Sequence, residues 1–203
     1  AAATAASVSG VDQLLADPLP SQRGMNERLG VAVIGARGRG NSHLGFYLSR
    51  RDTRVLYVCD VDSKVGALRG QQAARRQGGV PPVWVADLRH VLDDPRVDIV
   101  SIATPNHWHA LSAIWAMQAG KDVYVEMPVS HNIQEGRRMV EVARQCGRIC
   151  QSGLQARSNR GMVEAIEFVQ LGGIGNVTLA RGLCYKSRRP YSSADASPIP
   201  THI

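Results

Sequence analysis

Aromatic side chains are scarce in this sequence, at 5% of its 203 residues. Proteins that bind single-stranded nucleic acid combine a basic groove with aromatic side chains on which the bases stack. The net charge of +7 would suit such a partner, but the missing aromatic residues argue against it. We therefore expect no nucleic acid partner and assign the positive charge to a basic surface that also favours anionic ligands.

Long hydrophobic runs and paired cysteines are also absent. No stretch of the chain is long and apolar enough for us to expect a membrane span. The four cysteines include no C-x-x-C pair, and His107 and His109 form an H-x-H pattern with no third ligand nearby. Because zinc sites need three or four such ligands at suitable spacing, the sequence predicts no bound metal.

The first 28 residues begin with a run of small side chains from Ala1 to Ser9. Such a run is typical of the end of an export signal with its cleavage zone, and equally of a disordered arm. A signal remnant predicts an exported or periplasmic protein, whereas a plain arm predicts a cytoplasmic one. Both interpretations place residues 1–28 outside the folded domain.

Short apolar runs alternate with helical patterns from Leu29 to Gln151. This rhythm is typical of a parallel sheet with helices on both faces. It predicts a complete doubly wound α/β domain, a Rossmann fold, over residues 29–151. The expected strands are 29–34, 54–59, 83–85, 97–102, 123–125 and 148–151, and the expected helices are 40–50, 63–77, 88–92, 107–119 and 133–145.

The pattern changes after residue 151. We expect a helix over 161–171 and one strand from Val177 to Tyr185, followed by an irregular Ser/Pro/Ala-rich tail. A single strand cannot form a stable sheet. Residues 152–203 are therefore predicted to be the truncated start of a second, α+β domain for substrate binding or oligomerisation.

A glycine-rich loop, Gly35-Ala36-Arg37-Gly38-Arg39-Gly40, follows the first expected strand. Glycine lets the backbone approach a pyrophosphate, whose charge then lies at the N-terminus of the next helix. Asp60 ends the second expected strand, where an acidic side chain accepts hydrogen bonds from ribose hydroxyls and favours NAD over NADP. Because Lys64 lies nearby in the sequence, NADP is not excluded as the cofactor. A nicotinamide dinucleotide is the expected ligand.

A polar segment, Thr104-Pro105-Asn106-His107-Trp108-His109, ends the fourth expected strand. Ligands of doubly wound sheets bind outside the carboxyl ends of the strands, where the strand order reverses. Asn106 and the histidines are thus expected to face the cofactor, although a histidine in the first turn of a helix is more often structural.

Taken in order, these segments resemble the Gfo/Idh/MocA oxidoreductase family. The resemblance covers residues 29–185. It is carried by the glycine loop, Cys59-Asp60, residues 103–109, residues 119–128 and Gly153-Leu154-Gln155.

The resemblance implies NAD(P) binding, oxidation or reduction of a sugar or polyol hydroxyl, and association into a homo-oligomer. It also implies that Pro128 shapes a turn, often through a cis bond. The cofactor-binding residues that it implies are Gly35, Gly38, Arg39, Gly40, Asp60, Thr104, Pro105, Asn106, His109, Glu126 and Gln155.

One departure from the family pattern concerns catalysis. The family's Glu-Lys-Pro reads Glu126-Met127-Pro128 here, and methionine cannot accept or donate a proton. We therefore expect impaired hydride-transfer chemistry and assign no catalytic residue. Two alternatives stay open: an NAD-dependent glycoside hydrolase-like protein that oxidises its substrate transiently, and a non-catalytic nucleotide-binding remnant.

Overall fold

The computed structural model describes residues 28–183 and 199–203. The arm expected over 1–28 therefore lies outside the described residues except for Arg28, as do Cys184, Tyr185 and most of the expected irregular tail. The chain divides into two compact units, of which the first ends at Gly153 and the second begins at Leu154. Each unit is described by itself.

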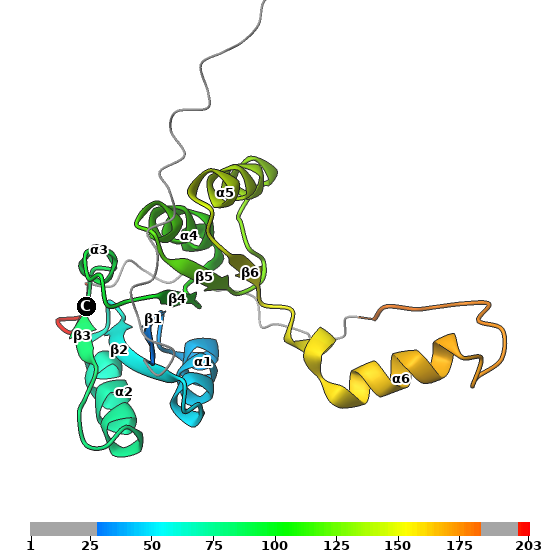
Figure 1. The fold of residues 1–203 in the computed structure, drawn as a ribbon, viewed down its shortest axis with the longest axis horizontal. Coiled ribbons are helices and arrows are strands. Elements are labelled where there is room, and N and C mark those ends of the chain that lie inside the picture. The colour runs from blue at the N-terminus through cyan, green and yellow to red at the C-terminus, as the bar shows by residue number, and fades with distance from the viewer. Residues whose placement is uncertain (1–27, 184–198) are drawn as a thin grey trace, which may run out of the picture. The chain divides into compact units, whose positions relative to one another are not determined.

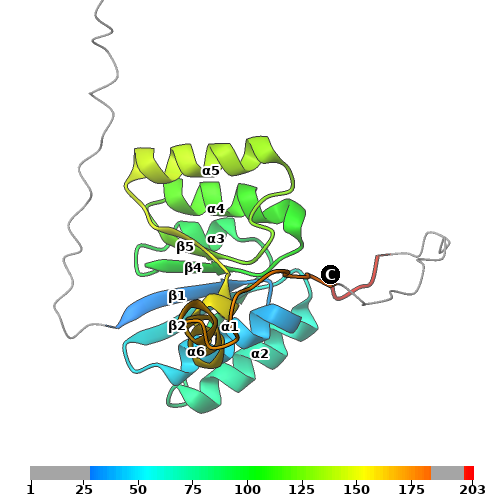
Figure 2. The same ribbon diagram turned by 90° about the vertical axis from the view of Figure 1, so that its right-hand side faces the viewer.

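The first unit is a six-stranded parallel sheet with the strand order β3-β2-β1-β4-β5-β6 (Figures 1 and 2). This order is that of a doubly wound Rossmann fold, and it confirms the predicted fold class. The strands are β1 (Leu29–Ile34), β2 (Thr53–Cys59), β3 (Val83–Val85), β4 (Ile99–Ile102), β5 (Asp122–Val125) and β6 (Cys150–Ser152).

Helices cover both faces of this sheet, as Figure 2 shows: α1 and α2 lie on one face, and α3, α4 and α5 lie on the other. A 3-10 turn, η1, precedes α4. The bounds are α1 (Gly38–Ser49), α2 (Ser63–Arg76), α3 (Arg89–Leu92), η1 (Asn106–Trp108), α4 (His109–Gln118) and α5 (Ile133–Cys146).

The central strands form because their side chains are apolar on both faces. Val31, Ala32 and Val33 of β1 are fully buried, and so are Val100 and Ile102 of β4. Continuous rather than alternating hydrophobicity is expected for strands that helices cover on both sides. Two apolar clusters result, and the sheet lies between them.

The register brings the carboxyl ends of the strands together. Ile34 at the end of β1 pairs with Cys59 of β2 and with Ile102 of β4. Ile102 in turn pairs with Val125 of β5, which pairs with Ser152 of β6. The loops that follow these residues therefore share one edge of the sheet, which is the edge where such folds bind ligands.

A buried carboxylate joins several segments near the amino ends of the strands, away from the glycine loop. Asp94, before β4, accepts hydrogen bonds from the Tyr57 hydroxyl at 2.8 Å and from Nη2 of Arg96 at 2.6 Å. Its own carbonyl accepts from Nζ of Lys121 at 2.7 Å, just before β5. The bonds from Arg96 hold the pKa of Asp94 well below its usual range, against the opposing effect of burial.

Among its described residues, the second unit contains a 3-10 turn, η2 (Gln155–Ser158), and one helix, α6 (Arg160–Gln170). Asn159 caps α6 by accepting a hydrogen bond from the backbone N–H of Met162 at 3.1 Å. The helix expected over 161–171 is thus present. None of the helices within residues 28–183 and 199–203 is long and apolar enough to cross a membrane.

The strand predicted from Val177 is wrong over its described part, because residues 177–183 adopt no strand conformation. The backbone there has no partner strand among the described residues, and a strand needs a partner to satisfy its N–H and C=O groups. Smaller differences affect element starts: β4 begins at Ile99 rather than 97, and β6 at Cys150 rather than 148.

Asp94→Asn is expected to lower the free energy of unfolding at neutral pH by about 1–3 kcal/mol, because it weakens buried hydrogen bonds to a charged group. Since the folded-state pKa of Asp94 is depressed, its contribution is present above the unfolded-state pKa of about 4 and is lost as the pH falls. Denaturant unfolding at several pH values should therefore show the gap between wild type and variant shrinking below about pH 4.

Asp87→Asn is the matched control, because Asp87 pairs with Arg89 in the same Asp-x-Arg arrangement but at the surface. Its side chain is 38% exposed, against 9% for Asp94. We expect little change for this variant, since exposed ion pairs contribute little. A gap for Asp94→Asn that stays constant with pH would contradict the assignment.

Candidate functional site

The glycine loop turns the chain from β1 into α1 with no room for side chains at two positions. Gly35 has a φ of +78°, and a Cβ there would lie 2.8 Å from the Ala103 carbonyl oxygen. A Cβ on Gly40 would lie 1.7 Å from the carbonyl oxygen of Gly35. Glycine is therefore required at both positions, because any side chain would push α1 away from the loop.

The N-terminus of α1 is open towards a ligand. Arg37, its N-cap residue, makes no side-chain capping bond, and the first turn contains no acidic residue. The first N–H groups of a helix have no partner within the helix and carry a partial positive charge. These groups suit a pyrophosphate, as the loop sequence predicts.

Asp60 lies beside this loop. Its Oδ2 accepts a hydrogen bond from the backbone N–H of Ala36 at 2.8 Å, and its Oδ1 accepts from that of Asp62 at 3.0 Å. A carboxylate has about four acceptor positions, so Asp60 keeps the capacity to accept bonds from two ribose hydroxyls. The predicted ribose-binding residue thus has a fixed orientation.

Both arginines of the loop are held by carboxylates. Arg37 pairs with Asp62, and Nε of Arg39 donates to Oε1 of Glu126 at 2.9 Å. Asp62 also caps α2 through the N–H groups of Lys64 and Val65. Burial acts to raise the pKa of Asp62, but these N–H groups and nearby cations outweigh it and lower the pKa.

The segment after β4 approaches the glycine loop from the other side. The backbone N–H of Ala103 donates to the Ile34 carbonyl at 2.8 Å, and Asn106 then begins η1. The Thr104 hydroxyl is buried and has no hydrogen-bond partner in the described structure. An orphaned hydroxyl at this edge, beside glycines without side chains, fits a polar ligand such as a dinucleotide.

His109, a predicted cofactor residue, is buried between two backbone segments. Its ring is 2% exposed and lies between two carbonyl oxygens, Pro128 O at 2.6 Å from Nδ1 and Thr104 O at 2.7 Å from Nε2. Both ring nitrogens are therefore engaged with the protein. His109 connects the Thr104 segment to the Pro128 turn and offers no free nitrogen to a cofactor.

Glu126 follows β5 and precedes the cis peptide bond between Met127 and Pro128. Oε1 of Glu126 accepts from Arg39 and also lies 2.8 Å from Nε2 of His43. Met127 is 55% exposed and carries no group that could exchange a proton. The first unit thus brings together Asp60, the glycine loop, Thr104 and Glu126 at one edge.

Gln155, the last predicted cofactor residue, begins η2 in the second unit. Three residues that support the edge of the first unit were not predicted from the sequence: His43, Asp62 and Ser101. One signal was available for His43, a polar side chain three positions after Gly40 on a helix that must pack against the sheet. Within the described part of the chain, no group of three or more His, Cys, Asp or Glu residues could hold a metal.

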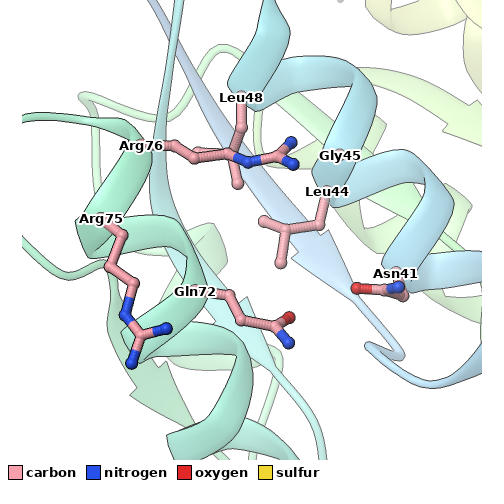
Figure 3. A pocket seen from close by; sticks show the side chains of 7 residues that line it. All are labelled: Asn41, Leu44, Gly45, Leu48, Gln72, Arg75 and Arg76. Carbon is pink, nitrogen blue, oxygen red and sulfur yellow. The ribbon is translucent and has the colours of Figure 1, made fainter.

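A separate groove of about 370 Å³ lies between α1 and α2 (Figure 3). Leu44, Leu48 and Gly45 of α1 face Gln72, Arg75 and Arg76 of α2 there, with Asn41 at the side. None of these residues is among the predicted cofactor contacts. Arg69 of α2 links this helix to the glycine loop by donating from Nε to the Ala36 carbonyl at 3.0 Å.

Comparisons with known proteins agree with this geometry. The scyllo-inositol 2-dehydrogenase (NAD(+)) of Bacillus subtilis is 31% identical over 162 residues, which cover 78% of this chain and 45% of that protein. A glycosyl hydrolase family 109 protein of Shewanella is 32% identical over 155 residues, covering 74% of this chain and 33% of its own length.

A solved structure, myo-inositol 2-dehydrogenase from Lactobacillus plantarum, superposes with a TM-score of 0.65 at 25% identity. The match covers 74% of this chain and 43% of that one. The chain thus spans less than half the length of these relatives. Residues 29–154 match the family model of the oxidoreductases with an NAD-binding Rossmann fold, and the chain belongs to this Gfo/Idh/MocA family.

Proposed function

We propose that this chain is the NAD-binding part of an oxidoreductase that acts on a hydroxyl group of a sugar or polyol. The observation that carries the proposal is the bond between the Ala36 N–H and the Asp60 carboxylate, which joins the phosphate loop to the ribose-binding residue. The names of the similar proteins, an NAD(+)-dependent inositol dehydrogenase among them, support the substrate class.

In this proposal each side chain has a defined task. The first turn of α1 binds the pyrophosphate, and Asp60 accepts bonds from the adenosine ribose. Thr104 and Glu126, which follow β4 and β5, lie in the second mononucleotide half and contact the nicotinamide side. NAD supplies the chemistry by accepting a hydride from the carbon that carries the hydroxyl.

A second candidate function comes from the name of a similar protein. Because Met127 cannot take the proton of a substrate hydroxyl, either reaction, net or transient oxidation, needs a base other than residue 127. A hydrolase that oxidises its substrate transiently leaves no net NADH, and one similar protein is named a glycosyl hydrolase family 109 protein. This second candidate is an NAD-dependent glycoside hydrolase.

The NAD site is tested by calorimetry with NAD⁺ on the wild type and on Gly40→Ala. We expect the variant to bind at least about tenfold more weakly, because its Cβ would collide with the Gly35 carbonyl. Gly45→Ala is the matched control in the same helix, where a Cβ meets nothing within 4 Å. The control should keep its affinity and gain up to about 1 kcal/mol of stability.

Cofactor choice is tested at Asp60. A carboxylate there repels a 2′-phosphate, so the wild type should bind NAD⁺ about tenfold or more tightly than NADP⁺. Asp60→Asn should reduce this ratio, whereas Asp52→Asn, which removes a charge at the amino end of β2, should leave it unchanged. Equal affinities for the two cofactors in the wild type would refute the role of Asp60.

The two candidate reactions differ in their products. Incubation with NAD⁺ and a polyol or sugar should give NADH fluorescence if the protein is a dehydrogenase. Release of dye from a chromogenic glycoside without accumulation of NADH indicates the hydrolase. NAD⁺ binding with neither product would support the non-catalytic, nucleotide-binding alternative.

A further inference from the structure

His43 is a buried polar side chain on the inner face of α1. It is 7% exposed, and its ring packs edge-on against Tyr124 of β5 with the centroids 5.2 Å apart. Nε2 lies 2.8 Å from Oε1 of Glu126, and Nδ1 lies 2.9 Å from the hydroxyl of Ser101 in β4, which is fully buried. One ring thus connects α1, β4 and the end of β5.

The direction of these hydrogen bonds follows from the chemistry of the carboxylate. Burial acts to raise the pKa of Glu126, but the hydrogen bonds from Arg39 and His43 outweigh burial and lower it. An ionised carboxylate only accepts hydrogen bonds, so Nε2 of His43 must carry a proton. The Ser101 hydroxyl lies at Nδ1 on the other side of the ring, so both ring nitrogens are held and the orientation of the ring is fixed.

Both donors act on the same oxygen of Glu126. Arg39 and His43 bind Oε1, and no described residue donates a hydrogen bond to Oε2. The backbone of Gly153 packs closely against the carboxylate, since a Cβ on Gly153 would lie 3.0 Å from Cδ of Glu126. The carboxylate is therefore fixed through one of its two oxygens.

We propose that His43 is a positioning residue that holds the Glu126 carboxylate towards the nicotinamide half of the cofactor. This inference rests on the proposed function, because Glu126 follows β5 in the half of the fold that receives the nicotinamide. His43 and Arg39 both belong to α1, whose first turn binds the pyrophosphate in that proposal. The two bonds therefore link the phosphate-binding helix to the nicotinamide side.

The experiment compares NAD⁺ with ADP-ribose, which lacks the nicotinamide ring. His43→Phe keeps an aromatic ring against Tyr124 but removes both hydrogen bonds. We expect it to weaken NAD⁺ binding about three- to tenfold, the range for one typical hydrogen bond lost, and to change ADP-ribose binding less than about twofold. His43→Gln, whose amide can donate to Glu126, should recover most of the NAD⁺ affinity.

His131→Gln is the matched control, because His131 has an exposed side chain outside the site. It should bind both ligands like the wild type. Equal weakening of NAD⁺ and ADP-ribose by His43→Phe, or no weakening of either, would overturn the inference. A folded wild type that binds neither ligand would instead refute the proposed function itself.

Nitrogen-15 NMR of the histidine rings keeps the inference testable if His43→Phe does not fold. In the wild type, Nε2 of His43 should carry the proton, and its resonance should shift more on adding NAD⁺ than on adding ADP-ribose. The resonance should also move in Glu126→Gln. A ring with no proton on Nε2, or one that responds equally to both ligands, would overturn the positioning role.

Discussion

The pairing of β1 with both β2 and β4 is the constraint on which the first unit depends. Because these strands are parallel and in register at Ile34, the chain must leave all three at the same edge. The glycine loop can then contact the segments after both neighbours, Asp60 on one side and Ala103 on the other. Residues that are distant in the sequence become one site because the sheet reverses its strand order there.

Much of this fold was predictable because its strands are buried on both faces. Short apolar runs such as Val31–Ile34 and Val100–Ile102, placed between helical patterns, are typical of strands in a covered parallel sheet. The first unit therefore has the expected order of elements, with differences of one or two residues at their starts. Residues 177–183 show the opposite case, since their apolar and β-branched side chains favour a strand but supply no partner for it.

Only those parts of the site that belong to a local sequence motif were predictable. The glycine loop and Asp60 are set by the turn geometry and by the end of a strand, which are local features. His43 and its partners are not local, because His43 lies 83 positions from Glu126 and 58 from Ser101. The cofactor roles assigned by resemblance stay predictions, and for His109 the structure shows a ring whose nitrogens both contact backbone carbonyls.

The position of His109 has a mechanical consequence. One buried ring bridges the Thr104 carbonyl and the Pro128 carbonyl, so the segment after β4 and the turn after β5 cannot shift independently. A ligand that displaces Thr104 would transmit that displacement through the imidazole to the turn that carries Glu126 and Met127. The two loops are therefore coupled to each other through one side chain.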